Sequence, residues 1–338
     1  MRKRIDKNLV IIVSLATLQF VLSSIIGLVN EAPVSNVLND VKPLLFIFSG
    51  IVFYSLIDSS KTIKLVTKLL KVSSLILAIT YLAVFAGINL GIIPFLPFYN
   101  MVQPTEEFFF RGEFAFFYKG FMYLCVGAIF YFWQFKESSK LTIFLICAAI
   151  VLTFTRGFIV SSASVFVVYF IFIKPKYVRS IVGLGILVLG LFFGWSYVSN
   201  SSNIDRGVSD SDRIVQIKEV AERFTIPSAV FGHGFGIGVP FRPEHMEISY
   251  LEIFHKQGLL GLLFWLIIFV YGTYLFKVTK HKGHSDSAMP FYLSMLFVYI
   301  QSFTNPFINN PIGLSMIMIS LAVLRFLAQQ ERDTAISA

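Results

Sequence analysis

The chain is poor in charged residues and in cysteine, and both shortages narrow what it can be. Only 14% of its 338 residues are charged, whereas a soluble domain carries about 25%. Its two cysteines, Cys125 and Cys147, lie in apolar stretches and suggest neither a disulfide framework nor a metal site. The histidines at 233, 245 and 255 also lack a compact metal-ligand spacing. We therefore expect no metal and no cofactor.

Apolar residues, in contrast, are abundant: 56% of the chain is hydrophobic and Phe alone occurs 38 times. Apolar stretches recur at lengths that suit a hydrocarbon core of about 30 Å. The first stretch, Leu9 to Val29, lacks a small-residue cleavage pattern after it, so we expect a membrane span rather than a signal peptide. The sequence predicts an all-α polytopic integral membrane protein that forms a single membrane domain over residues 1–338. Ten transmembrane helices are predicted, at 9–29, 41–57, 69–93, 118–135, 141–155, 157–173, 180–198, 248–276, 288–304 and 311–327.

Arg156 decides between nine and ten spans, because it is the one charge between Leu141 and Ile173. A single helix over that stretch would be about 50 Å long, far more than the hydrocarbon core needs. Two short helices that meet at Arg156-Gly157 would instead keep Lys140 and Lys174 on the same side of the membrane. We predict this break, with the turn in a water-filled recess.

The positive-inside rule supports ten spans with both termini in the cytoplasm. The inner segments then hold 18 of the 28 basic residues and 6 of the 19 acids, a net charge of +12, and the rest of the chain carries −3. The inner basic residues are Arg2, Lys3, Arg4, Lys7, Lys61, Lys64, Lys68, Lys71, Lys136, Lys140, Lys174, Lys176, Arg179, Lys277, Lys280, Lys282, Arg325 and Arg332. Because this charge is divided among short loops beside the membrane, it does not indicate binding to nucleic acid.

Two outer loops are long. Residues Pro94 to Phe117 mix aromatic and acidic side chains, which is typical of an interfacial or re-entrant segment. The loop of 49 residues at 199–247, between the seventh and eighth spans, is the largest soluble piece. It contains a predicted amphipathic helix at 212–224, which Asp210 or Ser211 can cap. We expect this helix to lie across the outer membrane surface or over a cavity.

Arg156 and Arg213 are the first candidate site residues. A charge inside the membrane usually has a function, and a guanidinium suits phosphate because its planar fork binds oxyanions and stays protonated. A snorkelling or ion-paired arginine is the alternative at Arg156. Arg213 would lie in the first turn of the loop helix, against the helix dipole. Asp210 and Asp212 offset this, and a local Asp–Arg surface pair explains its spacing equally well.

The segment FGHGFGIG at 231–238 has alternating glycines, but no strand–helix unit surrounds it, so it is not a nucleotide-binding signature. A flexible hairpin is one interpretation. The other is a backbone cradle in which Gly232, His233, Gly234 and Gly236 approach a sugar or a phosphate.

The segment from Pro243 leads into the eighth span and contains His245, Glu247, Tyr250 and Glu252. On a helix, Glu247 and Tyr250 would face the same way. A carboxylate or an imidazole here could act as general base toward a sugar hydroxyl. The alternative is a solvated helix cap, because acids are common in first turns.

Four motifs follow one another along the chain. They are Thr155-Arg156-Gly157, Asp210 to Arg213, Gly232/Gly234/Gly236, and Glu247 to Glu252 followed by Gly258-Leu259-Leu260-Gly261. This order resembles the O-antigen polymerase/O-antigen ligase superfamily of the bacterial envelope, with its Wzy-type polymerases. The resemblance covers residues 141–276 and is topological elsewhere.

The resemblance implies a GT-C-like glycosyltransferase, multi-pass in the bacterial inner membrane, with a periplasmic active site. Members transfer a glycan from a polyprenyl-pyrophosphate carrier and use no nucleotide sugar. Arg156 and Arg213 would then stabilise the departing pyrophosphate. Many ligase-type members carry a His-Asn pair before the Tyr-Leu of the last motif. Here Glu247 takes the place of that histidine, so we rank Glu247 above His245 as the base.

The missing His-Asn pair, the short chain and the Phe-rich composition favour a polymerase, which joins carrier-linked glycans. The alternatives are a ligase, which moves the finished glycan to lipid A-core, and a flippase for the lipid-linked unit. A flippase is disfavoured because the chain shows one interrupted span and no matching interruption elsewhere. The expected partners are the polyprenyl-pyrophosphate-linked oligosaccharide, the lipid bilayer and a chain-length regulator protein.

Overall fold

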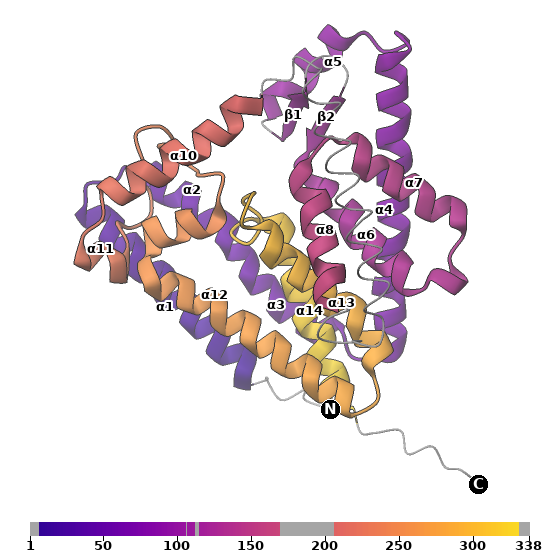
Figure 1. Cartoon of the computed structure of the whole chain (residues 1–338). Coiled ribbons are helices and arrows are strands. Elements are labelled where there is room, and N and C mark those ends of the chain that lie inside the picture. Colours follow the sequence, from indigo (N-terminus) through magenta and orange to yellow (C-terminus); the bar gives the residue numbers. More distant parts are fainter. Residues whose placement is uncertain (1–6, 106, 112–114, 170–205, 331–338) are drawn as a thin grey trace. The chain divides into compact units, whose positions relative to one another are not determined.

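The computed structural model of the protein describes residues 7–105, 107–111, 115–169 and 206–330 (Figure 1). The chain forms two compact units, one of Met1–Thr62 with Arg206–Ala338 and the other of Ile63–Asp205. Within the described residues, five helical segments are long and apolar enough to cross a membrane, namely Lys7–Val29, Val34–Leu56, Ser60–Asn89, Ser249–His281 and Pro311–Gln329. They confirm a multi-pass, mainly helical membrane protein. The count of ten stays a prediction, and the predicted span 180–198 lies outside the described residues.

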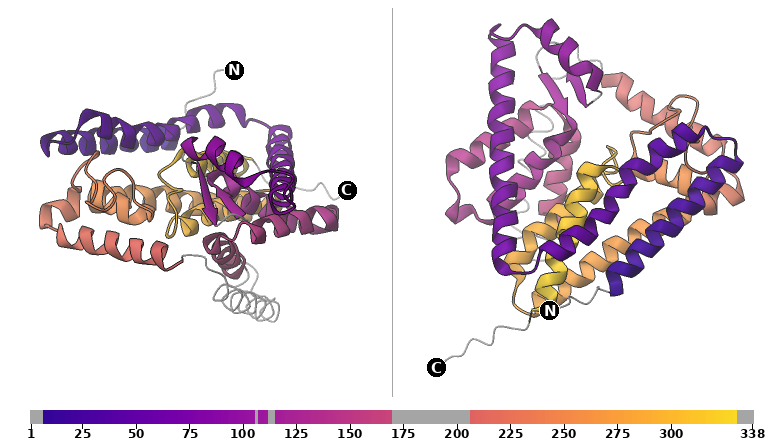
Figure 2. Two further views of the ribbon diagram at one scale, coloured as in Figure 1. Left: turned by 90° about the horizontal axis from the view of Figure 1, so that it is seen from above. Right: turned by 180° about the vertical axis from the view of Figure 1, so that it is seen from behind.

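In the first unit, α1 (Lys7–Val29) runs beside α12 (Ser249–His281), as two views show (Figures 1 and 2). The next segment consists of α2 (Val34–Leu44), the 3₁₀ turn η1 (Leu45–Phe48) and α3 (Ser49–Leu56). Pro43 explains the change of helix type, because proline has no N–H to donate and its ring crowds the preceding turn. The segment as a whole, Val34–Leu56, stays long enough to span a membrane.

The core of this unit is formed by α13 (Ser285–Gln301) and α14 (Pro311–Gln329), which pack on each other and on α12. Phe291, Phe297 and Ile317 are at most 1% exposed. The start of α14 follows from its sequence: Asn310 accepts hydrogen bonds from the N–H groups of Ile312 and Gly313, and the proline at the first helical position has no N–H to satisfy. This packing holds the loop between α13 and α14 against the start of α12.

The segment before α12 contains α10 (Arg206–Glu222) and α11 (Ile226–Phe231), the latter with a capping box between Thr225 and Ser228. The helix predicted at 212–224 lies within α10, except for its last two residues, and α10 begins earlier. Asp210 and Ser211 are therefore inside the helix instead of at its cap. The expectation that Arg213 lies in the first turn is wrong for the same reason.

Helix α12 is broken near its N-terminal end. Gly258 has φ 64° and ψ −161°, outside the helical region. A Cβ atom at this glycine would lie 2.3 Å from the carbonyl oxygen of Val230, at the end of α11. Both the positive φ and this close approach require glycine. The segment from Ser249 to Gln257 is consequently a short helix of its own, which packs against α11.

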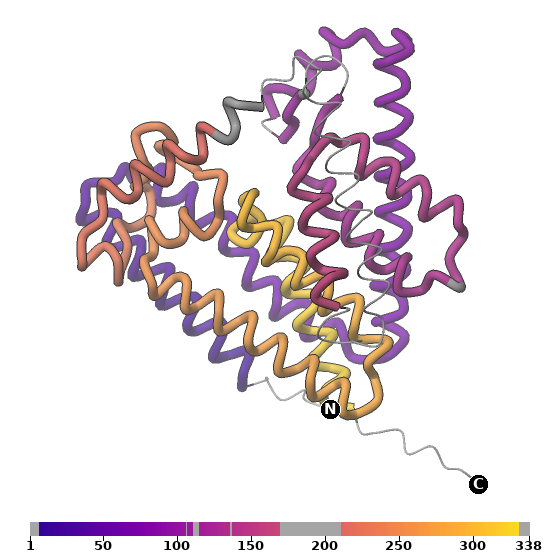
Figure 3. The backbone as a smooth tube through the Cα atoms, in the orientation of Figure 1, coloured from indigo at the N-terminus to yellow at the C-terminus, as the bar shows by residue number. Residues whose placement is uncertain are grey.

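The second unit contains most of α4 (Ser60–Asn89), together with α6 (Met122–Trp133), α7 (Lys140–Leu152) and α8 (Arg156–Val168). The predicted break between two short helices is confirmed (Figure 3): α7 ends at Leu152, Phe154 adopts φ 52°, and Arg156 begins α8. The break lies a few residues before the predicted Arg156-Gly157 junction.

Residues 94–117, expected as an interfacial or re-entrant segment, include a small antiparallel hairpin. Its strands are β1 (Phe108–Arg111) and β2 (Ala115–Tyr118), with Phe109 opposite Phe117. Aromatic residues suit a pleated surface, and their pairing across the strands stabilises the hairpin. The all-α expectation therefore needs this one correction within the described residues. The short helical elements of this unit are α5 (Phe95–Val102), η2 (Gln103–Thr105), η3 (Lys119–Phe121) and η4 (Phe135–Glu137).

Candidate functional site

The glycine-rich segment at 231–238 packs against helices of the first unit. Gly232, Gly234 and Gly236 all have positive φ, between 78° and 91°. At Gly234 a Cβ atom would lie 2.0 Å from the backbone nitrogen of Gly27 in α1, so only glycine fits there. This geometry gives the glycines a packing role. Their predicted contact with substrate stays a prediction.

Hydrogen bonds join this segment to the broken end of α12. The N–H groups of His233 and Gly234 donate to the carbonyl oxygens of His255 and Lys256 at 2.8 and 3.0 Å. These carbonyl groups end the short helix before Gly258, where a helix leaves acceptors without internal partners. The His233 ring also stacks on the His255 ring, with 4.4 Å between the centroids. The glycine segment thus fixes the end of the short helix that carries Glu252 and Lys256.

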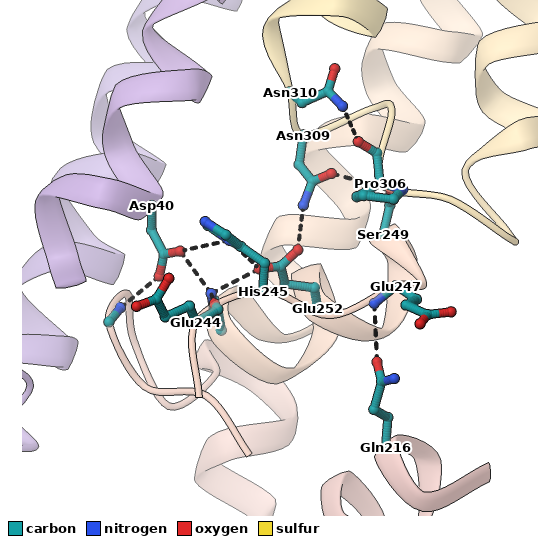
Figure 4. A network of polar contacts seen from close by, with 12 residues as sticks. Asp40, Gln216, Glu244, His245, Glu247, Ser249, Glu252, Pro306, Asn309 and Asn310 are labelled. Carbon is teal, nitrogen blue, oxygen red and sulfur yellow. Dashed lines mark hydrogen bonds and ion pairs between the residues drawn. The ribbon is translucent and has the colours of Figure 1, made fainter. Parts of the chain in front are cut away.

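Three charged side chains meet inside this unit (Figure 4). Lys256 Nζ lies 2.7 Å from Asp40 Oδ1 of α2 and 2.8 Å from Glu252 Oε1, one turn earlier in α12. Asp40 and Glu252 are labelled in Figure 4. The three side chains are only 3–6% exposed. The N–H of Gly236 donates to Asp40 Oδ2 at 2.7 Å, and the carbonyl oxygen of Glu244 accepts from Lys256. We call Asp40, Glu252 and Lys256 the buried cluster.

His245 adjoins the buried cluster from the loop that precedes α12. Its Nδ1 lies 3.2 Å from Glu252 Oε1 and 3.6 Å from Asp40 Oδ1, and the side chain is 51% exposed. The hydrogen bond to Glu252 raises the pKa of His245, against the lowering effect of its partial burial. With Nδ1 engaged by a carboxylate, Nε2 is the ring nitrogen left to exchange a proton with a ligand.

The loop between α13 and α14 supports the second oxygen of Glu252. Asn309 Nδ2 donates to Glu252 Oε2 at 2.6 Å, and Ser249 Oγ donates to Asn309 Oδ1 at 3.1 Å (Figure 4). Both oxygens of the Glu252 carboxylate are thus held, one by Lys256 and His245 and the other by Asn309. This fixes the direction from which the carboxylate meets the imidazole.

Asp40, His245 and Glu252 offer ligand atoms within 4.8 Å of one another, which is close enough for a shared cation. The Lys256 ammonium already lies within hydrogen-bond distance of both carboxylates. The lysine is thus a cation that already lies between the two carboxylates.

A second group of charges, which we call the arginine group, surrounds Glu247. Arg213 Nε and Arg242 Nη2 each lie 3.1 Å from one oxygen of the Glu247 carboxylate. Arg242 Nη2 also lies 3.6 Å from Asp212. These side chains are 20–41% exposed, so solvent and ligands reach them. Two guanidinium groups held this close can accept an oxyanion between them.

Glu247 is not part of α12, because the helix begins at Ser249 after the non-helical Ile248. The N–H of Glu247 instead donates to Gln216 Oε1 of α10 at 3.0 Å. The expectation that Glu247 and Tyr250 share a helix face is therefore wrong. Tyr250 donates its hydroxyl to the carbonyl oxygen of Tyr299 at 2.7 Å, and its ring packs on Phe303.

Arg156 lies in the second unit, at the first residue of α8 after the extended residue Thr155, and its side chain is exposed. The other sequence-predicted residues, Arg213, Gly232, His233, Gly234, Gly236, His245, Glu247 and Tyr250, all lie in the first unit. The structure brings His245 to the buried cluster and joins Glu247 to Arg213.

Sequence reasoning missed Asp40, Lys256, Asn309 and Arg242. A signal existed for Lys256, which is the one basic residue in the predicted span 248–276 and follows Glu252 by one helical turn. Asp40 stands directly before the predicted span 41–57. Asn309 gave no such signal, because its contact with Glu252 joins residues 57 positions apart.

The structure defines the class of this protein as a multi-pass membrane protein with a polar site at the N-terminal end of α12. The site combines a broken helix, the buried cluster and the partly exposed arginine group. The chain is similar to a protein named O-antigen polymerase from Shigella flexneri, with 29% identity over 300 residues, 86% of this chain and 74% of the relative. This match confirms the predicted resemblance to the O-antigen polymerases. No family model and no solved structure matches the chain.

Proposed function

We propose that the protein is a glycosyltransferase that polymerises a surface polysaccharide at the periplasmic face of the bacterial inner membrane. It transfers a polyprenyl-pyrophosphate-linked glycan onto a lipid-linked repeat unit. The similarity to the Shigella flexneri polymerase over 86% of the chain carries this proposal. In the proposed topology both termini are cytoplasmic, and the segment with His245 and Arg213 is periplasmic.

His245 is the proposed general base. The proton of the acceptor hydroxyl passes to Nε2 while the hydroxyl oxygen forms the glycosidic bond to the anomeric carbon. The bond from that carbon to the phosphate oxygen breaks, and its electron pair leaves with the pyrophosphate. The carboxylate of Glu252 on Nδ1 supports this role, because it fixes the tautomer and stabilises the imidazolium that forms.

Glu247, which we ranked first as base from the sequence, fits a different role. Its two oxygens each face an arginine at 3.1 Å, so both are already engaged in ion pairs with guanidinium groups. We propose that Glu247 orients Arg213 and Arg242, and that His245 takes the proton. The proposal thus reverses the order derived from the sequence alone.

Arg213 is the proposed ligand for the departing pyrophosphate in the first unit. It is half-buried, and its Nη2 also donates to the carbonyl oxygen of Thr304 at 3.4 Å, which directs the fork. Arg156 keeps its proposed role as an anion ligand, because it is the exposed first residue of a short apolar helix, and charges in such segments usually have a function. Gly232, His233, Gly234, Gly236 and Tyr250 remain proposed substrate contacts.

Two other functions are less well supported. The ligase function is disfavoured because the relative that the chain matches is named a polymerase. The flippase function has no supporting observation of its own. A chain-length regulator is a proposed partner on the grounds of family resemblance.

The proposal can be tested with purified protein in proteoliposomes and a synthetic lipid-linked repeat unit. We expect products that grow by one repeat unit per transfer, together with released polyprenyl pyrophosphate, and the His245→Gln variant serves as the inactive control. Movement of the unit across the bilayer without elongation would instead indicate a flippase. Transfer only to added lipid A-core would indicate a ligase.

A further inference from the structure

We infer that Asp40 and Lys256 are positioning residues that set the charge around His245 and so control how readily it accepts a proton. This inference rests on the proposed function, in which His245 is the base. Asp40 comes from α2 and Lys256 from α12, which are far apart in the sequence, and they meet at 2.7 Å beside the imidazole.

The first argument is the charge balance around the imidazole. The groups that face it are Asp40 from α2 and Glu252 and Lys256 from α12, and Glu244 of its own loop contributes a carbonyl oxygen to Lys256. Two carboxylates and one ammonium carry a net charge of −1. A proton on His245 brings the group to zero, so the surroundings match the imidazolium better than the neutral ring.

The second argument is burial. The three side chains of the buried cluster are 3–6% exposed, so their charges are poorly screened by water, whereas His245 is 51% exposed and can reach a substrate. Removing Asp40 would leave the cluster neutral, and removing Lys256 would leave it at −2. The two changes should therefore move the pKa of His245 in opposite directions.

The opposite signs separate this role from a purely structural one. If the ion pair served only to join α2 to α12, loss of either partner would weaken the fold. The pKa of His245 would then not move in opposite directions in the two variants. The N–H of Gly236, which donates to Asp40 Oδ2, fixes the aspartate independently of Lys256. Asp40→Asn can therefore keep this position while it loses its charge.

The test reads the protonation of His245 directly. Full-length protein in detergent is treated with diethyl pyrocarbonate, which acylates the neutral imidazole, and the peptide that contains His245 is quantified by mass spectrometry across pH. The midpoint is the pH at which acylation of His245 is half-maximal. In the Asp40→Asn variant we expect this midpoint to fall by about one pH unit, the size of the effect of a single nearby charge. We expect the midpoint of Lys256→Met to rise.

Two controls accompany these variants. Glu244→Gln removes an exposed carboxylate next to His245 in the sequence, and we expect an unchanged midpoint. The double variant Asp40→Asn/Lys256→Met removes both partners, leaves no unpaired buried charge between them, and should return the midpoint toward that of the wild type. It also provides a folded reference if one of the single variants is unstable.

Midpoints that stay unchanged, or that move the same way in Asp40→Asn and Lys256→Met, would overturn the inference. The acylation titration does not depend on polymerisation, so the two proposals fail separately. Full polymerase activity in His245→Gln would overturn the role of His245 as base, while opposite shifts in the titration would still establish the coupling. Unmoved midpoints together with an inactive His245→Gln would overturn the coupling alone.

Discussion

Two groups of charges near the start of α12 differ in their access to water. In the buried cluster the side chains are at most 6% exposed, and each is held at 2.7–2.8 Å to another member. In the arginine group the side chains are 20–41% exposed, and the contacts are longer. Buried pairs lose their partners only at high cost, whereas half-exposed pairs exchange partners with solvent or ligand. We interpret the first group as fixed support for a base and the second as a site that can receive an anion.

The largest effect should come from breaking the buried cluster on one side. Lys256→Ala leaves Asp40 and Glu252 without their cation, and removal of one partner of a buried pair costs about 3–5 kcal/mol. We expect a lower unfolding temperature in detergent. Arg213→Ala, in the arginine group, should cost no more than about 1 kcal/mol. Equal destabilisation of the two variants would mean that the groups do not differ as their exposure indicates.

The next effect concerns catalysis at the edge of the buried cluster. His245→Gln should lower the elongation rate about a hundredfold or more, because a glutamine cannot take the proton of the acceptor. The rate of repeat-unit addition in proteoliposomes measures this. His281→Gln, at the far end of α12, is the matched control and should elongate like the wild type. A His245→Gln enzyme of normal rate would place the base elsewhere.

The pH dependence of elongation should report the same group. The contact with Glu252 raises the pKa of His245, and the proposed mechanism uses the neutral ring, so activity should fall as the pH drops through this raised pKa. The acid limb should thus lie above the value of an ordinary histidine, about 6.5. An initial-rate profile measures it, and a limb at ordinary or lower pH would contradict the contact with Glu252.

A smaller loss is expected when a guanidinium is replaced by an ammonium. Arg213→Lys keeps the charge but loses the planar fork, so elongation should drop by about tenfold. Arg156→Lys should lose most of its activity for the same reason. Lys218→Arg, on the exposed face of α10, is the control. Normal polysaccharide chain length at normal protein levels in Arg156→Lys would contradict a phosphate-binding role for that residue.

The smallest loss of elongation rate should follow from Glu247→Gln. Glu247 is the residue that the sequence alone ranks first as the base. An orienting residue that loses its charge should change the rate only a few-fold, because the arginines stay near the site and are hydrated. The KM for the donor is the sensitive readout, since the arginines then lose their common partner. A loss as large as that of His245→Gln would restore Glu247 as the base.

The sequence predicted features that depend on neighbouring residues or on composition. The lone charge at Arg156 predicted the break between α7 and α8, and the apolar stretches predicted a multi-pass membrane protein. The start of α12 was less predictable. Glu247 has a good helical sequence around it, but its N–H bonds to Gln216, 31 residues earlier, and this contact competes with helix formation.

The buried cluster could not be derived from spacing, because Asp40 and Lys256 are 216 residues apart. Only the packing of α2 against α1, α14 and the glycine segment brings them together. Of these two residues, Lys256 alone indicated a buried ion pair from the sequence, because a lysine inside an apolar helix needs a partner. The sequence named Glu252, its partner one turn earlier, but gave no reason to search for an aspartate near the N-terminus.

The backbone at Gly258 has a consequence for how this protein can lose its activity. A side chain there would force the chain out of its left-handed turn and swing the short helix from Ser249 to Gln257 away from α11. Glu252 would then turn away from the imidazole although every ionisable group is still present. The positive φ of Gly258 is thus needed to keep Glu252 beside His245. A substitution at this uncharged residue would inactivate the protein without the alteration of any charge.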